Sequence, residues 1–156
     1  MTNGRPPAWH LAQLNIGRLR APIDSPLVAD FVNAIAAVNE SAERSPGFVW
    51  RLQSDSGNAT DIQLFDDPQM IVNLTVWESI EALHVFTYSR TGMHAPVLAR
   101  RREWFEHTDQ AYLVLWWVPA GHIPSTQEAL ARLEHLRAEG PSPHAFTFKQ
   151  SFPAPE

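Results

Sequence analysis

The sequence predicts an α+β domain in which helices pack on a four-stranded antiparallel sheet. Segments with period-two alternation of apolar residues are interrupted by segments with helical spacing, in the order β-α-β-β-α-β plus a further C-terminal helix. This is the order of the ferredoxin-like split βαβ fold. The 156 residues suit one domain. We assign residues 9–150 to it, with 1–8 as a disordered N-terminal arm and 151–156 as a frayed tail.

Four segments carry the strand pattern. They alternate apolar with other residues, or form short apolar runs between turn residues: 9–19, 47–53, 70–77 and 111–119. Pro119 closes the last of them, since proline has no amide hydrogen to continue a ladder.

Helical spacing of apolar residues predicts helices over 26–43, from about 79 to the Arg-Thr-Gly at 90–92, over about 93–106 and over 125–139. Ser25 precedes Pro26 as N-cap and first helical residue. Ser125 and Glu128 have the capping-box spacing, and Gly140 marks the end of the last helix.

Composition excludes several classes of protein. The net charge is −5, so no concentrated basic surface for nucleic acid is expected. The one basic run, 100–102, fits a solvated helix face or a clamp for an anionic ligand group. There is no cysteine, which excludes disulfides, zinc-thiolate sites and a cysteine nucleophile. Without a secretory signal or an apolar run of membrane-spanning length, we expect a cytoplasmic protein that does not enter a membrane.

An amide lies in an otherwise apolar strand. Asn73 is flanked by apolar residues in segment 70–77, where burying a side-chain amide costs free energy. Side chains alternate along a strand, so Asn73 shares one face with Thr75 and Trp77. The purely apolar alternate residues take the other face, which we expect to lie under the helices.

The first strand repeats this pattern, with Gln13 and Asn15 opposite its apolar residues. The first and third strands are central neighbours in the ferredoxin-like order. Amides and Trp77 should therefore converge on one sheet face. Such a face, with no helix above it, suggests a dimer whose sheets enclose a ligand cavity. A purely structural role for Asn73 and Trp77 stays open. Trp50 is a further candidate for the cavity or for the core.

Five segments resemble one known family. They are AQLNIGRL, ERSPGFVWRLQ, VNLTVWESIEAL, RRREWF and LVLWWVPAGHIP. They are similar to a bacterial domain-of-unknown-function family of the dimeric α/β-barrel superfamily, which also contains antibiotic-biosynthesis and haem-degrading monooxygenases. The resemblance spans roughly residues 10–150 and implies a homodimeric α/β barrel, but no particular reaction.

The better-known relatives imply two chemistries. Cofactor-free, quinone-forming monooxygenases have an Asn and a Trp four residues apart, as Asn73 and Trp77 are. There the substrate's own phenolate reduces dioxygen, and the protein positions and deprotonates it. In haem-degrading relatives the corresponding residues would be Asn15, Trp77 and an iron-ligating His94, or His84 as a second possibility. The gap before His94 is longer than in those relatives.

We therefore expect a small, cofactor-independent, monooxygenase-like enzyme acting on an aromatic or polycyclic molecule. The first alternative is haem binding or degradation through His94; the second is a non-catalytic binding or structural dimer. No metal site made only of side chains is expected, because no close ligand spacing occurs. The candidate catalytic residues are Asn73, Trp77 and His94, and the candidate substrate-binding residues are Gln13, Asn15, Thr75 and Trp50.

Overall fold

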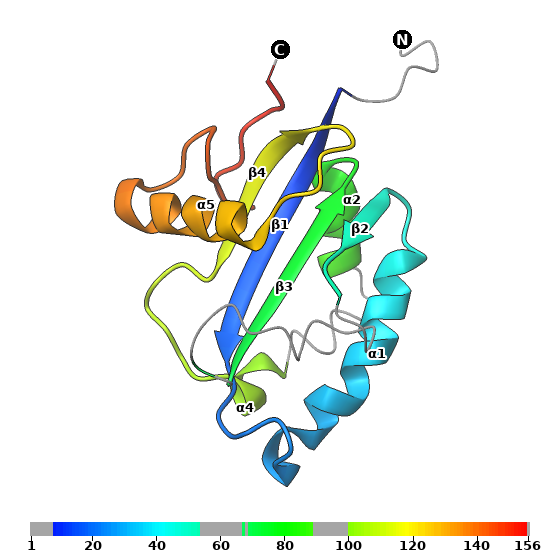
Figure 1. Ribbon diagram of the computed structural model, residues 1–156, viewed down its shortest axis with the longest axis vertical. Coiled ribbons are helices and arrows are strands. Elements are labelled where there is room, and N and C mark those ends of the chain that lie inside the picture. Colours follow the sequence, from blue (N-terminus) through cyan, green and yellow to red (C-terminus); the bar gives the residue numbers. More distant parts are fainter. Residues whose placement is uncertain (1–7, 54–66, 68, 89–99, 156) are drawn as a thin grey trace.

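A computed structural model describes residues 8–53, 67, 69–88 and 100–155. Its centre is an antiparallel sheet with strand order β2-β3-β1-β4, which confirms the predicted ferredoxin-like order (Figure 1). The strands are β1 (Trp9–Arg18), β2 (Phe48–Arg51), β3 (Met70–Trp77) and β4 (Leu113–Pro119). The two central strands pair in the register Asn15 with Asn73 and Gln13 with Thr75, which sets the polar residues side by side.

The helices follow the expected segments. They are the 3₁₀ turn η1 (Pro26–Val28), α1 (Ala29–Glu43), α2 (Ile80–Tyr88), α4 (Arg101–Trp104) and the extra C-terminal helix α5 (Thr126–Glu139). Both predicted caps form: the Ser25 hydroxyl accepts from the amide of Leu27, and the Ser125 hydroxyl from that of Glu128. The helix expected over 93–106 is found as α4 within its described part, and 93–99 lie outside the described residues.

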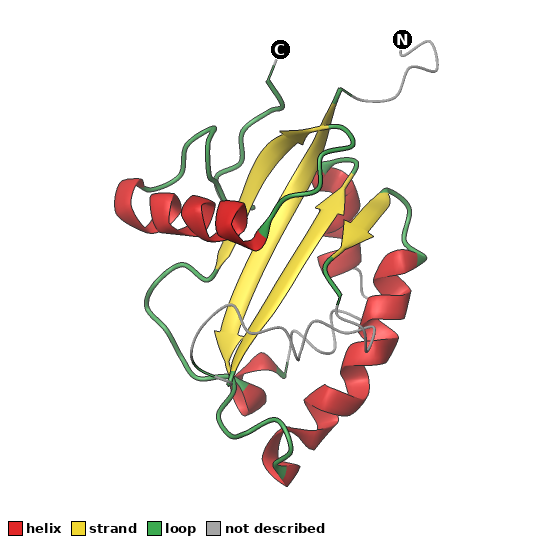
Figure 2. Cartoon of the chain, in the orientation of Figure 1, coloured by secondary structure: helices red, strands yellow, loops and turns green. Residues whose placement is uncertain are grey.

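Helices cover both faces of the sheet (Figure 2). The apolar face packs against Ala129, Leu133 and Leu136 of α5, while α1 and α2 contribute to the clusters on the polar face. Our assignment of the faces was therefore wrong. Right-handed crossovers place α1 and α2 on the same side of a sheet, but strand alternation does not say which side. The polar face is covered by the chain's own helices, so an uncovered face is no argument for a dimer. The homodimer stays a prediction.

A bulge in β2 changes which side chains share a face. Phe48 pairs with Trp77 and Trp50 with Val76, so the register shifts by one residue between them. Phe48 packs with Trp77, whereas Trp50 packs on the apolar face. Strict alternation without the bulge would place Phe48 and Trp50 on the same face, so the bulge decides that Trp50, a candidate for the cavity or the core, lies on the apolar face.

The segment after α5 returns along the edge of β4. Phe146 exchanges backbone hydrogen bonds with Leu115, at 2.8 and 2.9 Å. Further on, the Trp117 indole donates to the carbonyl oxygen of Phe152 at 2.9 Å. The tail expected to fray from 151 is thus held at Phe152. No helix among the described residues combines the length and apolar character needed to cross a bilayer.

Candidate functional site

A cavity of about 870 Å³ lies between the polar face of the sheet and helices α1, α2 and α4. Its floor is formed by alternate residues of the two central strands, because these point to the same face. The sheet therefore brings together the predicted polar and aromatic residues: Gln13, Asn15, Asn73, Thr75 and Trp77.

Gln13 is the centre of a hydrogen-bond network on this floor and is 3% exposed. Its Nε2 donates to Asn73 Oδ1 at 3.0 Å and to Thr75 Oγ1 at 2.8 Å. Its Oε1 accepts from Asn15 Nδ2 at 2.5 Å, and that same nitrogen donates to Asn73 Oδ1 at 3.1 Å. The four side chains therefore fix one another's orientation, and buried polar groups held in this way are rigid.

The network leaves a specific set of groups for a ligand. Thr75 Oγ1 accepts from Gln13 and from the Trp77 indole at 2.9 Å, so both lone pairs are used and the hydroxyl hydrogen is left to donate. Asn73 Nδ2 and Asn15 Oδ1 have no hydrogen-bond partner among the described residues, and both residues line the cavity. The floor thus offers two kinds of donor and one acceptor.

Trp77 forms one aromatic end of the cavity. It is fully buried, stacks on Phe86 with ring centroids 5.2 Å apart, and meets the edge of Phe48 at 5.5 Å. Its indole nitrogen is committed to Thr75. Trp77 is therefore a wall that also sets the direction of the Thr75 hydroxyl.

The opposite end is built by α4. Phe31 of α1 contacts Trp104 and Phe105, with ring centroids 5.6 and 5.1 Å apart. Arg101 lies over the rings of Phe105 and Tyr112, at 4.6 and 4.2 Å, and donates to the carbonyl oxygen of Ile16. Burial lowers the pKa of the Arg101 guanidinium, and the nearby Tyr112 opposes that shift.

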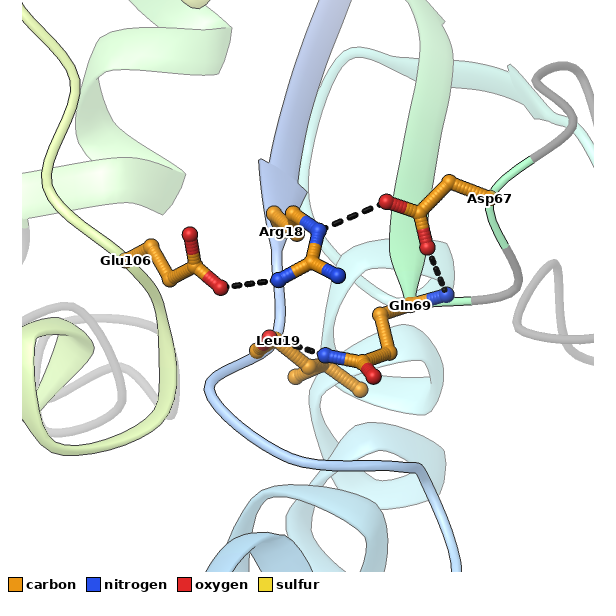
Figure 3. A network of polar contacts seen from close by, with 5 residues as sticks. All are labelled: Arg18, Leu19, Asp67, Gln69 and Glu106. Carbon is orange, nitrogen blue, oxygen red and sulfur yellow. Dashed lines mark hydrogen bonds and ion pairs between the residues drawn. The ribbon is translucent and has the colours of Figure 1, made fainter.

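Polar contacts join the end of β1 to the residues before β3 and to the segment after α4 (Figure 3). Arg18 pairs with Asp67 at 2.6 Å and with Glu106, which directly follows the α4 segment. The hydrogen bond from Arg18 lowers the pKa of the Asp67 carboxyl. Gln69 donates to Asp67 through its backbone and to the carbonyl of Leu19 through its side chain. The Arg18 guanidinium of β1 thus binds two segments: the residues that precede β3 and those that follow α4.

The remaining predicted residues are not part of this group. Trp50 packs on the apolar face, away from the cavity, because of the bulge. His94 lies outside the described residues. His84 is exposed on α2 and contacts the rings of Tyr88 and Phe148.

The basic run 100–102 divides between two roles. Arg100 pairs with Asp30 and Glu103 on the surface, which fits the solvated helix face. Arg101 turns inward to the cavity and packs between aromatic rings. Successive side chains at the start of a helix point in different directions around its axis, so Arg100 faces solvent while Arg101 faces the cavity.

Two sets of lining residues were missed. Arg51 is on the cavity face of β2, opposite Thr75; its position on the reverse side from Trp50 was the available signal. Phe148 and Lys149 reach the cavity from the return segment after α5. Nothing in the local sequence pattern shows that this segment meets the polar face.

The described lining of the cavity does not include the histidine that the haem alternative requires. No histidine, cysteine or methionine is among the described residues that line the cavity, and no group of three metal-ligating side chains was found in the described part of the chain. We therefore derive no step through haem, and the role of His94 stays a prediction.

The fold and the cavity define a class: an α+β ferredoxin-like domain with a ligand-sized cavity between sheet and helices. The chain belongs to the family described as "Domain of unknown function (DUF3291)", whose model matches residues 10–156. This confirms the predicted membership of a family of unknown function. No curated protein matches the chain.

Solved structures are similar to this chain at low sequence identity. PA3566 from Pseudomonas aeruginosa is 10% identical, with a TM-score of 0.50 over 76% of this chain and 100% of that one. SnoaB, a cofactor-independent oxygenase from Streptomyces nogalater, is 16% identical, with a TM-score of 0.45 over 73% of this chain and 95% of its own. A putative antibiotic biosynthesis monooxygenase from Nitrosomonas europaea is 12% identical, with a TM-score of 0.48 over 76% and 95%. At 10% identity, the similarity to PA3566 is evidence for the fold and not for a function.

Proposed function

We propose that this chain binds an aromatic or polycyclic small molecule in the cavity and oxygenates it with dioxygen, without a metal or organic cofactor. The observation that carries the proposal is the network on the cavity floor. It holds Asn15, Asn73 and Thr75 rigid and leaves a donor or acceptor of each for a ligand. Donors and acceptors left at a cavity surface can hydrogen-bond a ligand in place of water, which supports the proposal.

The cavity suits a planar ligand. Its volume of about 870 Å³ falls within the usual range of ligand pockets, on the order of 300–1,000 Å³. Aromatic rings stand at both ends, with Trp77 and Phe86 at one and Trp104 and Phe105 at the other. A ring system between them would lie across the polar floor, so apolar walls would supply affinity and the amides would fix orientation.

The floor fits the stabilisation of a negatively charged oxygen. The Asn73 amide and the Thr75 hydroxyl can donate to a phenolate or enolate, which favours the ionised, electron-rich form of the substrate. In the proposed reaction the phenol C–OH and one ring C–H of the substrate become the two carbonyls of a quinone, with loss of the O–H and C–H hydrogens. One atom of dioxygen forms the new carbonyl and the other leaves as water with those two hydrogens, so the substrate supplies all four electrons.

Asn73→Leu tests the proposal, with Asn33→Leu on the exposed face of α1 as the matched control. Binding of mono-, bi- and tricyclic phenols is followed by quenching of tryptophan fluorescence, and turnover by dioxygen uptake. We expect Asn73→Leu to weaken binding about 10-fold or more, as loss of a hydrogen bond to a charged group does, and the control to match the wild type.

Three outcomes decide among the readings. Dioxygen uptake that Asn73→Leu abolishes supports the oxygenase. Binding without uptake leaves a binding protein and rejects the reaction. A Soret band that saturates near one hemin per chain and is lost in His94→Ala would replace the proposal by the haem alternative.

A further inference from the structure

Arg51 is a buried cation on the wall of the cavity. It is the last residue of β2, pairs in register with Thr75, and is 9% exposed. Paired residues on one face of an antiparallel sheet have Cβ atoms roughly 5 Å apart. Arg51 therefore stands beside the amide network and lines the same cavity.

The described residues satisfy this guanidinium poorly. Its Nε is buried and makes no hydrogen bond within the described part of the chain. The nearest carboxylate oxygen, from Glu43, is 3.4 Å from Nε, and that side chain is 44% exposed. Nη2 reaches the Gln53 amide oxygen only at 3.5 Å. Among the described residues this guanidinium therefore has one ion-pair contact, with Glu43, and one long hydrogen bond, to Gln53.

A second arginine in the cavity differs in this respect. Arg101 has aromatic rings within 5 Å of its guanidinium and donates to the carbonyl of Ile16 at 3.2 Å. Its position is explained by those contacts. Arg51 has no ring contact of this kind among the described residues, and its buried Nε lacks a hydrogen-bond partner there.

A buried guanidinium is stable when its N–H groups are paired, and a carboxylate matches two of them at once. We infer that the ligand of this cavity is an aromatic carboxylate, whose carboxylate binds Arg51 while its ring lies over Asn73 and Thr75. The inference rests on the binding half of the proposed function and names the ligand class. It makes Arg51 the residue that selects acidic over neutral aromatic ligands.

The experiment compares two ligands that differ by one carboxylate, 3-hydroxy-2-naphthoate and 2-naphthol, on the full chain. Affinities are measured by calorimetry for the wild type, Arg51→Met, Arg51→Lys and Arg101→Met. Arg102→Met is the control, because Arg102 is exposed on α4. Thermal unfolding establishes that each variant is folded. If Arg51→Met does not fold, Arg51→Lys still tests the role of the guanidinium.

The wild type should bind the carboxylate about 10- to 100-fold more tightly than the neutral phenol, as a charged hydrogen-bonded pair predicts. Arg51→Met should remove this preference without weakening 2-naphthol, Arg51→Lys should keep part of it, and Arg102→Met should keep all of it.

The inference and the proposed function fail differently. Equal wild-type affinity for both ligands overturns the role of Arg51 and leaves the cavity a binding site. A preference removed by Arg101→Met but not by Arg51→Met also overturns it. Failure of both ligands, and of the wider phenol panel, to bind rejects the proposed function itself.

Discussion

Gln13→Leu removes the centre of the hydrogen-bond network while keeping a side chain of similar length. The change deletes three hydrogen bonds, to Asn73, Thr75 and from Asn15. A buried neutral hydrogen bond contributes about 1 kcal/mol, so the loss comes to roughly 3 kcal/mol. Burying the leucine recovers part of this, about 1 kcal/mol for a site already 3% exposed. We expect the free energy of unfolding to fall by about 2 kcal/mol.

Urea unfolding followed by tryptophan fluorescence measures this change through the midpoint at constant slope. In a domain of this size about 2 kcal/mol corresponds to a drop in Tm of roughly 4–8 °C. Gln127→Leu, on the exposed side of α5, is the matched control and should change stability by less than about 0.5 kcal/mol. If Gln13→Leu is as stable as the wild type, the network does not order the cavity floor and our reading of it is wrong.

Two further changes test other parts of the structure. Gly17→Ala places a Cβ 2.6 Å from Phe105, so the aromatic end must shift; we expect a loss of about 1–3 kcal/mol and weaker ligand binding, and an unchanged Tm would contradict the packing described. Glu128 is the acceptor for His122 and Trp116. Burial raises its pKa, but those two hydrogen bonds together with the charges of His122 and Arg132 outweigh that and hold it below the ordinary 4.5. Its contribution, about 0.5–1 kcal/mol, is therefore complete above pH 4.5 and lost as pH falls through the folded-state pKa. The stability difference between the wild type and Glu128→Gln should accordingly shrink in acid, and a difference that grows there would refute the assignment.

The sequence was informative wherever a local rule decides the structure. Period-two alternation placed Gln13, Asn15, Asn73 and Thr75 on one face, and the ferredoxin-like order made their strands neighbours. The serine caps likewise depend on residues within one turn. Convergence of the amides could therefore be predicted before any coordinates.

The side of the sheet on which α1 and α2 lie could not be predicted in this way. Both faces of β3 bury apolar residues, Val72 and Leu74 on one side and Trp77 on the other, so composition does not distinguish them. The bulge at Phe48 was hidden for a similar reason, since one extra residue in a short strand leaves alternation plausible in either register. The same shift places Trp50, a candidate for the cavity or the core, on the apolar face, and it turns Arg51 toward the cavity.

The segment after α5 gives the C-terminal part of the chain a place in the cavity wall. Phe146 is anchored on the edge of β4, and Thr147, Phe148 and Lys149 then join a wall whose other described lining residues precede α5. A short covalent segment thereby connects α5 on one face of the sheet with the cavity on the other. A truncation that removes Phe148 and Lys149 would therefore alter the cavity wall as well as the C-terminus.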